Sequence, residues 1–375
     1  MNIGISGIIL NRNKRGFEFY LRQLVEHLAR LDGEFHIFIY TDRPLDDFSG
    51  SDKVTVRVVP NRFRTFFWRN FSLPLEAFRD KIDIFHFPDN SVWLFPWKPT
   101  VVTLHDISPV LCRKQNITSR WMLVIIRLIY FFIVTNARLI VTDSKSSKRD
   151  IERYFGLPEG RVVAVPISCN PKFQSVNNNQ NKDRLNDIKL GEKTVLFVGA
   201  LDRRKNVVKV VQAVEIVRQR WKKDVRLIIV GQIKRIKGLR YTRRKEILYH
   251  RNIKDFVSLL GYVDLNKLIA LYNVADVYVL PSHYEGFGMT VLEAQSCGTP
   301  VILSDSNWAD EISGGNCLFI DPDNEVDIAE KILLMLKNSD LANELHRKGI
   351  DHAKTFSWHT TAENMLRIYT DIVKK

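Results

Sequence analysis

The sequence contains few cysteines, and they are not arranged in pairs. Four cysteines occur among the 375 residues, and none belongs to a C-x-x-C pair. This spacing indicates neither a disulfide framework nor a zinc site, and it is compatible with a reducing cytoplasm. The first residues also lack the basic region and the small-residue cleavage site of a signal peptide, so we expect a cytoplasmic protein.

Signatures of several other binding classes are also missing. Gly4 and Gly7 are not part of a G-x-G-x-x-G dinucleotide fingerprint, and the first helical pattern begins well after them. No zinc finger or RNA-binding aromatic motif is present, so we expect no nucleic-acid partner. The apolar stretch 121–134 is too short to span a bilayer and carries Arg127 near its centre, which favours a buried or interfacial helix.

Basic and apolar residues are both abundant. The formal net charge of +14 favours anionic partners, such as phosphorylated substrates or an acidic membrane face. Hydrophobic residues make up 45% of the chain, and its length suggests two domains. Between Arg62 and Arg79, aromatic residues interleave with arginines. This segment is either an exposed element suited to lipid headgroups or a groove, or an amphipathic core helix with solvated arginines.

Apolar runs of strand length alternate with helical patterns in both halves of the chain. This rhythm predicts an α/β protein with two doubly wound, Rossmann-like domains that face a crevice. The first domain is expected over residues 1–171, and the polar, asparagine-rich stretch 172–193 is predicted to be a linker or exposed loop. The second domain is expected over 194–355. An amphipathic C-terminal helix, within 356–375, can then pack back on the first domain.

The stretch 277–304 predicts a buried strand, a glycine loop, a short helix and a second buried strand. Loops after parallel strands that open onto helix N-termini bind anions in α/β proteins. Glu285 lies in the glycine loop and Glu293 lies eight residues later in the helix. Two carboxylates beside such a loop suggest a polyol held next to a phosphate. Alternatively, Thr290 and Glu293 form a capping box, and Glu285 is a solvated loop acid.

A second candidate site follows the predicted strand 101–104. His105 and Asp106 end this strand and face the usual ligand crevice of α/β folds. A histidine there donates or accepts a hydrogen bond, and an adjacent acid can fix its protonation state. A purely structural histidine is the alternative.

Four segments carry motifs that are specific only in combination. They are 285–288 with Glu293 and 298–301, 198–199 with 204–206, 103–106, and 144–150. Together they resemble the retaining glycosyltransferases of family 4, which have the two-domain GT-B fold. The first segment is similar to the E-x7-E motif of that family. The chain departs from some relatives at Ala200, where they carry an arginine, and at 167–170, where they have Asn-Gly.

The resemblance implies transfer of a hexose from a nucleotide-diphosphate sugar to a glycan or lipid-linked acceptor in polysaccharide biosynthesis. Mannose is the first expectation, with GDP-mannose as donor substrate and no cofactor. The departing diphosphate must be neutralised. Arg204 supplies a guanidinium that can bind it in a bidentate way, and Lys205 supplies a compact positive charge. No D-x-D signature is present, so we expect no metal. The implied catalytic residues are His105, Asp106, Arg204, Lys205 and Glu285.

The resemblance also implies a donor-binding set in the second domain, whereas the first domain would bind the acceptor. Glu293 would accept the ribose hydroxyls, and Glu285 would lie near the hydroxyls of the transferred sugar. His105 would reach the sugar from the opposite domain. The donor-binding residues are Gly199, Arg204, Lys205, Tyr262, Val263, Glu285, Gly286, Phe287, Gly288, Met289, Thr290 and Glu293.

Two alternatives to a glycosyltransferase stay open at this point. One is another enzyme on the same fold, such as a nucleotide-sugar 2-epimerase or a phosphorylase. The other is a non-catalytic basic protein that binds nucleic acid or an anionic membrane. For the transferase, the aromatic and basic segments 62–69 and 121–132 suggest peripheral association with the inner membrane face.

Overall fold

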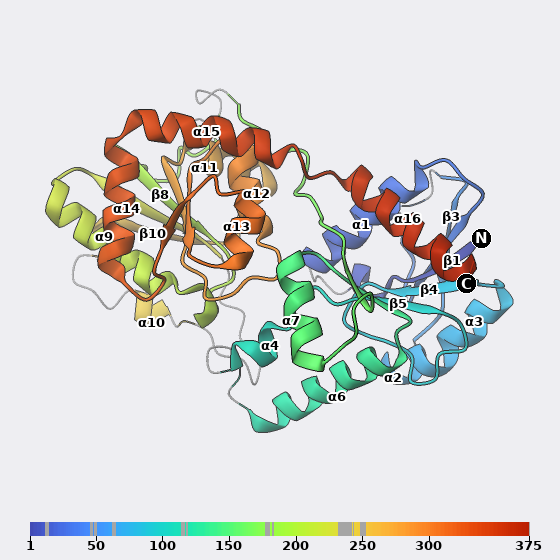
Figure 1. The fold of residues 1–375 in the computed structure, drawn as a ribbon. Helices are drawn as coiled ribbons and strands as arrows, with labels where there is room; N and C mark the ends of the chain where they lie inside the picture. Colours follow the sequence, from blue (N-terminus) through green and yellow to red (C-terminus); the bar gives the residue numbers. More distant parts are fainter. Residues whose placement is uncertain are drawn as a thin grey trace. The chain divides into compact units, whose positions relative to one another are not determined.

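The computed structural model describes residues 1–11, 15–45, 48, 51–61, 65–113, 117, 119–176, 181, 184–231, 242, 244–247 and 253–374. The chain forms two compact units (Figure 1). The first consists of Met1–Ile107, Val124–Ile167 and Phe356–Lys375, and the second of Ser108–Leu123 and Ser168–Thr355. Residues 108–123 thus group with the second unit, whereas the sequence places them in the first domain.

The first unit is built on a seven-stranded parallel sheet with the order β3-β2-β1-β4-β5-β6-β7. Apart from the edge strand β3, its strands are short and mostly buried apolar runs, as expected for a parallel sheet covered on both faces. The strands are β1 (Asn2–Ser6), β2 (His36–Thr41), β3 (Val54–Val58), β4 (Ile84–Phe87), β5 (Thr100–Thr103), β6 (Leu139–Thr142) and β7 (Val162–Ala164).

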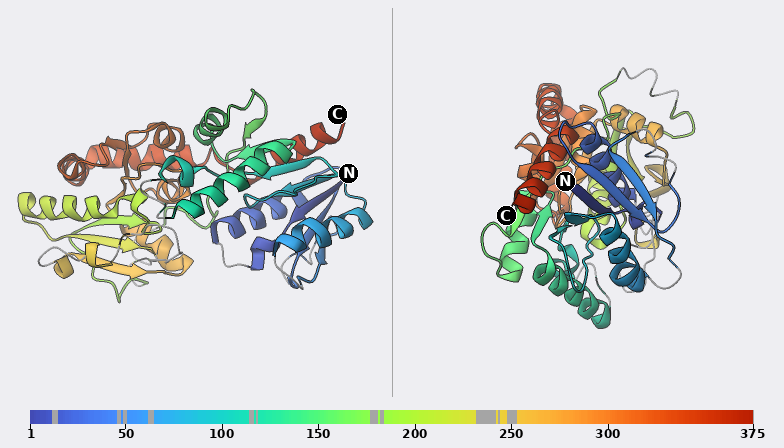
Figure 2. Two further views of the ribbon diagram at one scale, coloured as in Figure 1. Left: turned by 90° about the horizontal axis from the view of Figure 1, so that it is seen from below. Right: turned by 90° about the vertical axis from the view of Figure 1, so that its right-hand side faces the viewer.

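The helices of the first unit cover this sheet. Helix α1 (Arg15–Ala29) buries Leu21, Leu24 and Leu28 along one face. The C-terminal helix α16 (Trp358–Lys374) packs against α1 and β4, and the two ends of the chain lie close together (Figures 1 and 2). The other helical segments are η1 (Ile8–Asn11), α2 (Thr65–Phe67), the π-helical turn η2 (Trp68–Ser72), α3 (Leu73–Arg79), α6 (Arg120–Asn136) and α7 (Lys145–Phe155).

The second unit has a six-stranded parallel sheet with the order β10-β9-β8-β11-β12-β13. Its strands are β8 (Lys193–Val198), β9 (Val225–Val230), β10 (Val257–Gly261), β11 (Val277–Leu280), β12 (Val301–Ser304) and β13 (Leu318–Ile320). Its helical segments are α4 (Ser108–Leu111), η3 (Arg203–Lys205), α9 (Val207–Trp221), α10 (Arg244–Ile247), η4 (Ile253–Asp255), α11 (Leu265–Val274), α12 (Met289–Ser296), α13 (Asn307–Ser313), α14 (Glu325–Lys337) and α15 (Ser339–Ala353).

Each sheet has one point where the direction of strand addition reverses. In the first unit the reversal lies between β1 and β4, and in the second it lies between β8 and β11. Loops that leave the carboxyl ends of the two strands at such a point turn to opposite faces, which leaves room for a ligand. The loop after Val198 and the loop after Leu280 therefore begin side by side at the reversal in the second unit.

Two sequence expectations need correction. The apolar run 2–10 predicts a single first strand, but the strand ends at Ser6, because residues 8–11 form a 3₁₀ turn. The predicted linker or exposed loop 172–193 is exposed at 174–176 and 186–187, but it is anchored in the second unit, where Phe173, Leu185 and Ile188 are buried. Phe173 packs its ring edge-on against Tyr272, with 5.7 Å between the ring centroids.

No helix among the described residues is both long enough and apolar enough to cross a membrane.

Candidate active site

The carboxyl ends of β8 and β9 approach each other without side chains between them. A Cβ atom on Gly231 would lie 1.9 Å from the carbonyl oxygen of Gly199, which no side chain can tolerate. A Cβ atom on Gly199 would lie 2.7 Å from Cδ of Lys205. The two glycines therefore keep the loop after β8 low over the sheet and let the Lys205 side chain lie directly above it.

A short 3₁₀ turn presents Arg204 and Lys205 at this edge. Asp202 caps the turn, because its side chain accepts a hydrogen bond from the backbone N–H of Lys205 at 3.2 Å. The backbone N–H of His283 donates to the carbonyl of Arg204 at 3.0 Å, so the turn is tied to the loop after β11. Both cationic side chains are 11% exposed. They are thus held in a largely dry position at the carboxyl end of the sheet.

Glu285 is the partner of both cations. Its carboxylate lies 2.9 Å from the Arg204 guanidinium and 3.0 Å from the Lys205 ammonium, and it accepts a hydrogen bond from Ser282 at 2.7 Å. Burial by itself would raise the pKa of Glu285, but the charges of Arg204 and Lys205 outweigh burial and hold the pKa at about 2. The Arg204 guanidinium also donates to the backbone carbonyl of Tyr284. The structure thus joins three predicted catalytic residues into one cluster.

Glu293 lies on α12 in a different environment. It accepts a hydrogen bond from the hydroxyl of Tyr272 at 2.9 Å, and burial raises its pKa to about 7. The alternative in which Thr290 and Glu293 form a capping box is wrong, because α12 begins one residue before Thr290 and its N-cap is Gly288. Gly288 has φ +88°, a left-handed conformation that favours glycine. Glu293 is therefore not a helix cap, and its partner Tyr272 comes from α11.

The glycine loop sits directly before α12. Phe287 is buried, and the Thr290 hydroxyl accepts from Tyr278 of β11 at 2.8 Å, which fixes the first turn of the helix against the sheet. The N-terminus of a helix carries a partial positive charge, so the start of α12 adds a favourable field for an anion at this loop. Gly286 is buried in the same loop, and Met289 is the first residue of the helix.

The remaining predicted donor residues lie further along the same sheet edge. Tyr262 and Val263 follow β10, which is separated from β11 by β9 and β8. Tyr262 is 53% exposed and Val263 is buried. They lie at the carboxyl end of the sheet, as Glu285 does, and their contact with a base stays a prediction.

In the first unit, His105 is paired with an acid that sequence reasoning missed. Its Nδ1 atom lies 2.6 Å from the carboxylate of Asp143, which directly follows β6, and its Nε2 atom lies 3.2 Å from the carbonyl of Pro88. Burial lowers the pKa of His105, but the charge and hydrogen bond of Asp143 outweigh it, so the net pKa is raised. Asp106, the neighbour expected to fix the state of His105, makes a smaller contribution in the same direction.

A buried polar network lies behind His105. His86 bridges Thr103 and Tyr369, with 2.7 Å to each, and Tyr20 shares the hydroxyl of Thr103 at 3.1 Å. Burial lowers the pKa of His86 to about 3, so this histidine is neutral and links α16 to the sheet.

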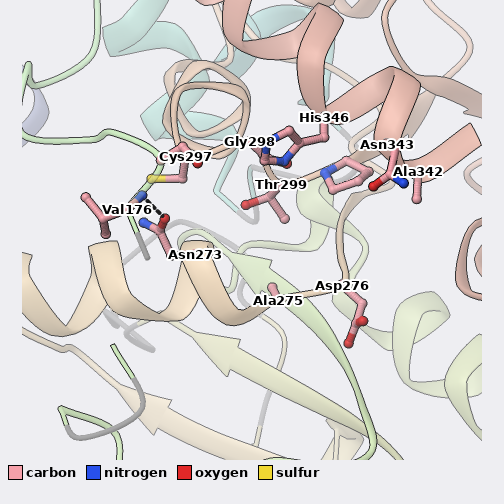
Figure 3. A pocket seen from close by; sticks show the side chains of 12 residues that line it. Val176, Asn273, Ala275, Asp276, Cys297, Gly298, Thr299, Ala342, Asn343 and His346 are labelled. Carbon is pink, nitrogen blue, oxygen red and sulfur yellow. Dashed lines mark hydrogen bonds between the residues drawn. The ribbon is translucent and has the colours of Figure 1, made fainter. Parts of the chain in front are cut away.

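A pocket of about 470 Å³ lies at the opposite end of the second sheet (Figure 3). Its lining includes residues that precede β11 and β12, such as Asn273 and Thr299, and His346 of α15. Their polar groups serve the fold: Thr299 donates to the carbonyl of Tyr272 at 2.6 Å, and His346 contacts the carbonyl of Gly298 at 2.6 Å. This pocket is therefore not part of the candidate site.

Within the described ranges, no group of three or more histidine, cysteine or acidic residues is arranged to hold a metal ion.

Two family models match the chain, one on each half. The model for "Glycosyltransferase Family 4" matches residues 14–172, and the model for "Glycosyl transferases group 1" matches residues 178–352. The chain is a family 4 glycosyltransferase. The glycine loop, Glu285 and Glu293 lie within the second match.

This glycosyltransferase has a relative of similar sequence and solved structures of similar fold. It is 28% identical over 298 residues to the O-antigen chain mannosyltransferase B of Escherichia coli, covering 78% of this chain and 76% of the relative. Its fold is similar to that of sucrose-phosphate synthase from Thermosynechococcus elongatus, with a TM-score of 0.76, 20% identity and 99% of both chains covered. It is also similar to Anabaena HepE in complex with UDP-glucose, with a TM-score of 0.74, 15% identity and 99% and 100% coverage. Each of the two units has the Rossmann-like architecture of the GT-B fold.

Proposed function

We propose that this glycosyltransferase is a retaining, metal-independent hexosyltransferase that acts on a nucleotide-diphosphate sugar. The observation that carries the proposal is the buried cluster of Arg204, Lys205 and Glu285 at the strand reversal, directly before the N-terminus of α12. Cleavage of the donor leaves negative charge on a diphosphate, and fixed cations in a dry site stabilise such charge strongly. The two cations and the helix start provide this stabilisation without a metal.

The roles of the other residues follow from the chemistry of the donor. Glu293 accepts the ribose hydroxyls, and Tyr262 and Val263 meet the base. Glu285 meets the hydroxyls of the transferred sugar while it keeps Arg204 and Lys205 in place. His105 and Asp106 keep the sugar-binding roles that the family resemblance implies. Retention follows from attack on the face of the leaving group, with a donor phosphate oxygen taking the proton of the acceptor hydroxyl.

The proposed donor is GDP-mannose. The similarity to a mannosyltransferase that acts on O-antigen chains supports a mannosyl donor and an acceptor in polysaccharide biosynthesis. The likeness to HepE, whose structure holds UDP-glucose, supports a nucleotide sugar but favours a different one. A thermal-shift screen of nucleotide sugars separates these donors, because a ligand at 100 times its Kd stabilises by about 2.7 kcal/mol. Stabilisation by UDP-glucose alone would overturn the mannosyl assignment.

Turnover distinguishes a transferase from the other enzymes of this fold. The proposal predicts release of free GDP from GDP-mannose only when an acceptor glycan is present, and the same rate in the presence of EDTA. Nucleotide release without acceptor indicates an epimerase or hydrolase. A rate that falls in EDTA and returns with Mg²⁺ contradicts metal independence.

We further propose that the acceptor is lipid-linked and that the first unit binds the surface of an anionic bilayer. Helix α6 buries Tyr130 and Ile133, yet its remaining side is also apolar, with Leu128 52% and Phe131 56% exposed. Such a helix is suited to lie in the interface of a bilayer. The helix contains arginines and no acid, which matches anionic headgroups.

A second apolar element continues this surface. On the α2–α3 segment, Phe71, Leu75 and Phe78 are exposed, whereas Trp68 is buried. The exposed side of this segment is therefore largely apolar, although the Arg79 side chain at its end is also exposed. Asn70 and Asn136 both bind the segment 93–94, which ties η2 to the end of α6. Of the predicted membrane segment 62–69, residues 62–64 lie outside the described residues.

Sedimentation with vesicles tests this surface. The full chain should sediment with phosphatidylglycerol-containing vesicles at low salt, and the double variant Ile125→Glu and Leu128→Glu should stay in solution. Leu334→Glu is the matched control, because Leu334 is similarly exposed, at 42%, but lies on α14 of the second unit. Equal sedimentation of the double variant, or none of the native chain, contradicts the proposal.

A further inference from the structure

The pairing of β5 with β6 sets His105 opposite an acid. The register pairs Val102 with Ile140 and Thr103 with Val141. Backbone contact continues beyond the strands, since the N–H of Leu104 donates to the carbonyl of Val141 at 2.8 Å. Continuing this register by two residues places His105 across from Asp143. Their contact is thus a direct result of strand pairing rather than of a mobile loop.

The partners of the imidazole are both acceptors. Nδ1 faces the Asp143 carboxylate at 2.6 Å, and Nε2 faces the backbone carbonyl of Pro88 at 3.2 Å. A carbonyl and an ionised carboxylate offer no proton. A neutral imidazole satisfies only one of them, whereas the imidazolium donates to both. Phe17 and Tyr20 meet the ring edge-on, with centroid distances of 4.8 and 4.9 Å, and fix its plane.

Asp143 has no evident role in supporting the fold. The residue that caps α7 is Ser144, whose side chain accepts from the N–H of Ser147 at 2.9 Å. Asp143 is 4% exposed, and its second oxygen is buried without a hydrogen-bond partner among the described residues. A buried carboxylate is costly unless it is paired, and His105 is the one described side chain that pairs with it.

We propose that Asp143 is a positioning residue that holds His105 as a fixed imidazolium for binding the sugar-phosphate substrate. The contact with the substrate rests on the proposed function, whereas the pairing of Asp143 with His105 does not. Asp106 also favours the charged form of His105. His86 itself stays neutral, and burial keeps the Tyr20 phenol neutral as well. Asp143 is therefore the dominant anion facing the ring.

Nuclear magnetic resonance of ¹⁵N-labelled histidines in the full chain tests the pairing directly. His105→Gln identifies the signal. In the native protein the ring should titrate above 6.5, the ordinary pKa of histidine, and in Asp143→Asn the titration should move to lower pH. Asp106→Asn is the matched control and should give a smaller shift. A native titration below 6.5, or an equal or larger shift in the control, overturns the proposal.

The pH profile of turnover tests the role in substrate binding. Native kcat/KM should fall as the pH rises through the titration of His105, and in Asp143→Asn this fall should move to lower pH by the same interval that the resonance measures. Asparagine has the same size and can still accept from Nδ1, so folding should be retained. An unchanged profile overturns the role in binding. If no nucleotide sugar is turned over but the resonance shifts hold, the proposed function fails while the pairing stands.

Discussion

Glu285 is buried and Glu293, eight residues later, is half-buried, and their surroundings shift the pKa values of the two carboxyl groups in opposite directions. Glu285 faces Arg204 and Lys205, and its pKa is held at about 2. Glu293 faces the hydroxyl of Tyr272, and its pKa is raised to about 7. The glycine loop thus holds a permanent anion, whereas the following helix holds an acid that changes charge near neutral pH. Glu285 is therefore suited to support two cations, whereas Glu293 is suited to accept hydrogen bonds from hydroxyls and to change its charge near neutral pH.

The largest effect is expected from removing a cation of the Glu285 cluster. Lys205→Ala should reduce acceptor-dependent nucleotide release by about 10²–10³-fold, because the departing diphosphate loses a fixed positive charge. Lys209→Ala is the matched control, since Lys209 forms its ion pair with Glu325 outside the cluster. Unchanged turnover in Lys205→Ala would remove the cluster from the catalytic assignment.

Glu285→Gln tests the other side of the same ion pairs. It should lower the free energy of unfolding at pH 7 by about 3–5 kcal/mol, because two buried cations lose their counter-charge. The lowered pKa means that Glu285 stabilises the fold fully above about pH 4.5 and loses this effect as the pH falls toward 2. Urea unfolding of both proteins between pH 7 and pH 3 should therefore show a difference that shrinks in acid. A constant difference contradicts the pairing.

Glu293→Gln should have the opposite effect on the free energy of unfolding. The raised pKa means that folding favours the protonated acid, so its contribution is present below about pH 4.5 and is lost as the pH rises through about 7. The variant should therefore unfold with a free energy higher by up to about 3 kcal/mol at pH 8 and with no gain at pH 4. Donor affinity should fall about 10-fold, because a charged acceptor of the ribose hydroxyls is lost. Destabilisation at pH 8 contradicts this description.

The smallest effect is expected for Tyr272→Phe. The Tyr272 hydroxyl lowers the pKa of Glu293, so its removal should move that titration above about 7. The free energy of unfolding should fall by about 1 kcal/mol, the value of one hydrogen bond. The pH at which donor affinity is half-maximal, measured by calorimetry, should rise with the titration. A shift to lower pH means that Tyr272 does not support the ionised form.

Much of the fold follows from local sequence, because buried parallel strands are short apolar runs. The stretch 277–304 folds, as predicted, into strand β11, a glycine loop, helix α12 and strand β12. Long-range pairing explains what was missed. Tyr272 precedes Glu293 by 21 residues and meets it only through the packing of α11 beside α12. Asp143 is 38 residues from His105 in the sequence. The signal that could have predicted their contact is that each residue comes shortly after the end of one of two neighbouring strands.

Two sequence patterns were misleading for a common reason. In each, one nearby residue favours a different local structure from the one that the pattern indicates. The Thr290–Glu293 spacing fits a capping box, but Gly288 adopts the left-handed conformation and starts the helix earlier. The stretch 172–193 is polar on average, but isolated residues such as Phe173 and Leu185 are enough to anchor it. In both cases, a single residue with special geometry or burial outweighed the pattern around it.

Because helix α16 is at the C-terminal end of the chain, it affects the order in which the two units can be completed during synthesis. The first unit requires Phe356–Lys375, although its preceding segment ends at Ile167. At roughly 5–20 residues per second, a ribosome needs on the order of 10–40 s to cross the intervening stretch. During this time His86 lacks its Tyr369 partner and the α1 face stays uncovered. The second unit, although encoded later, can therefore become complete before the first.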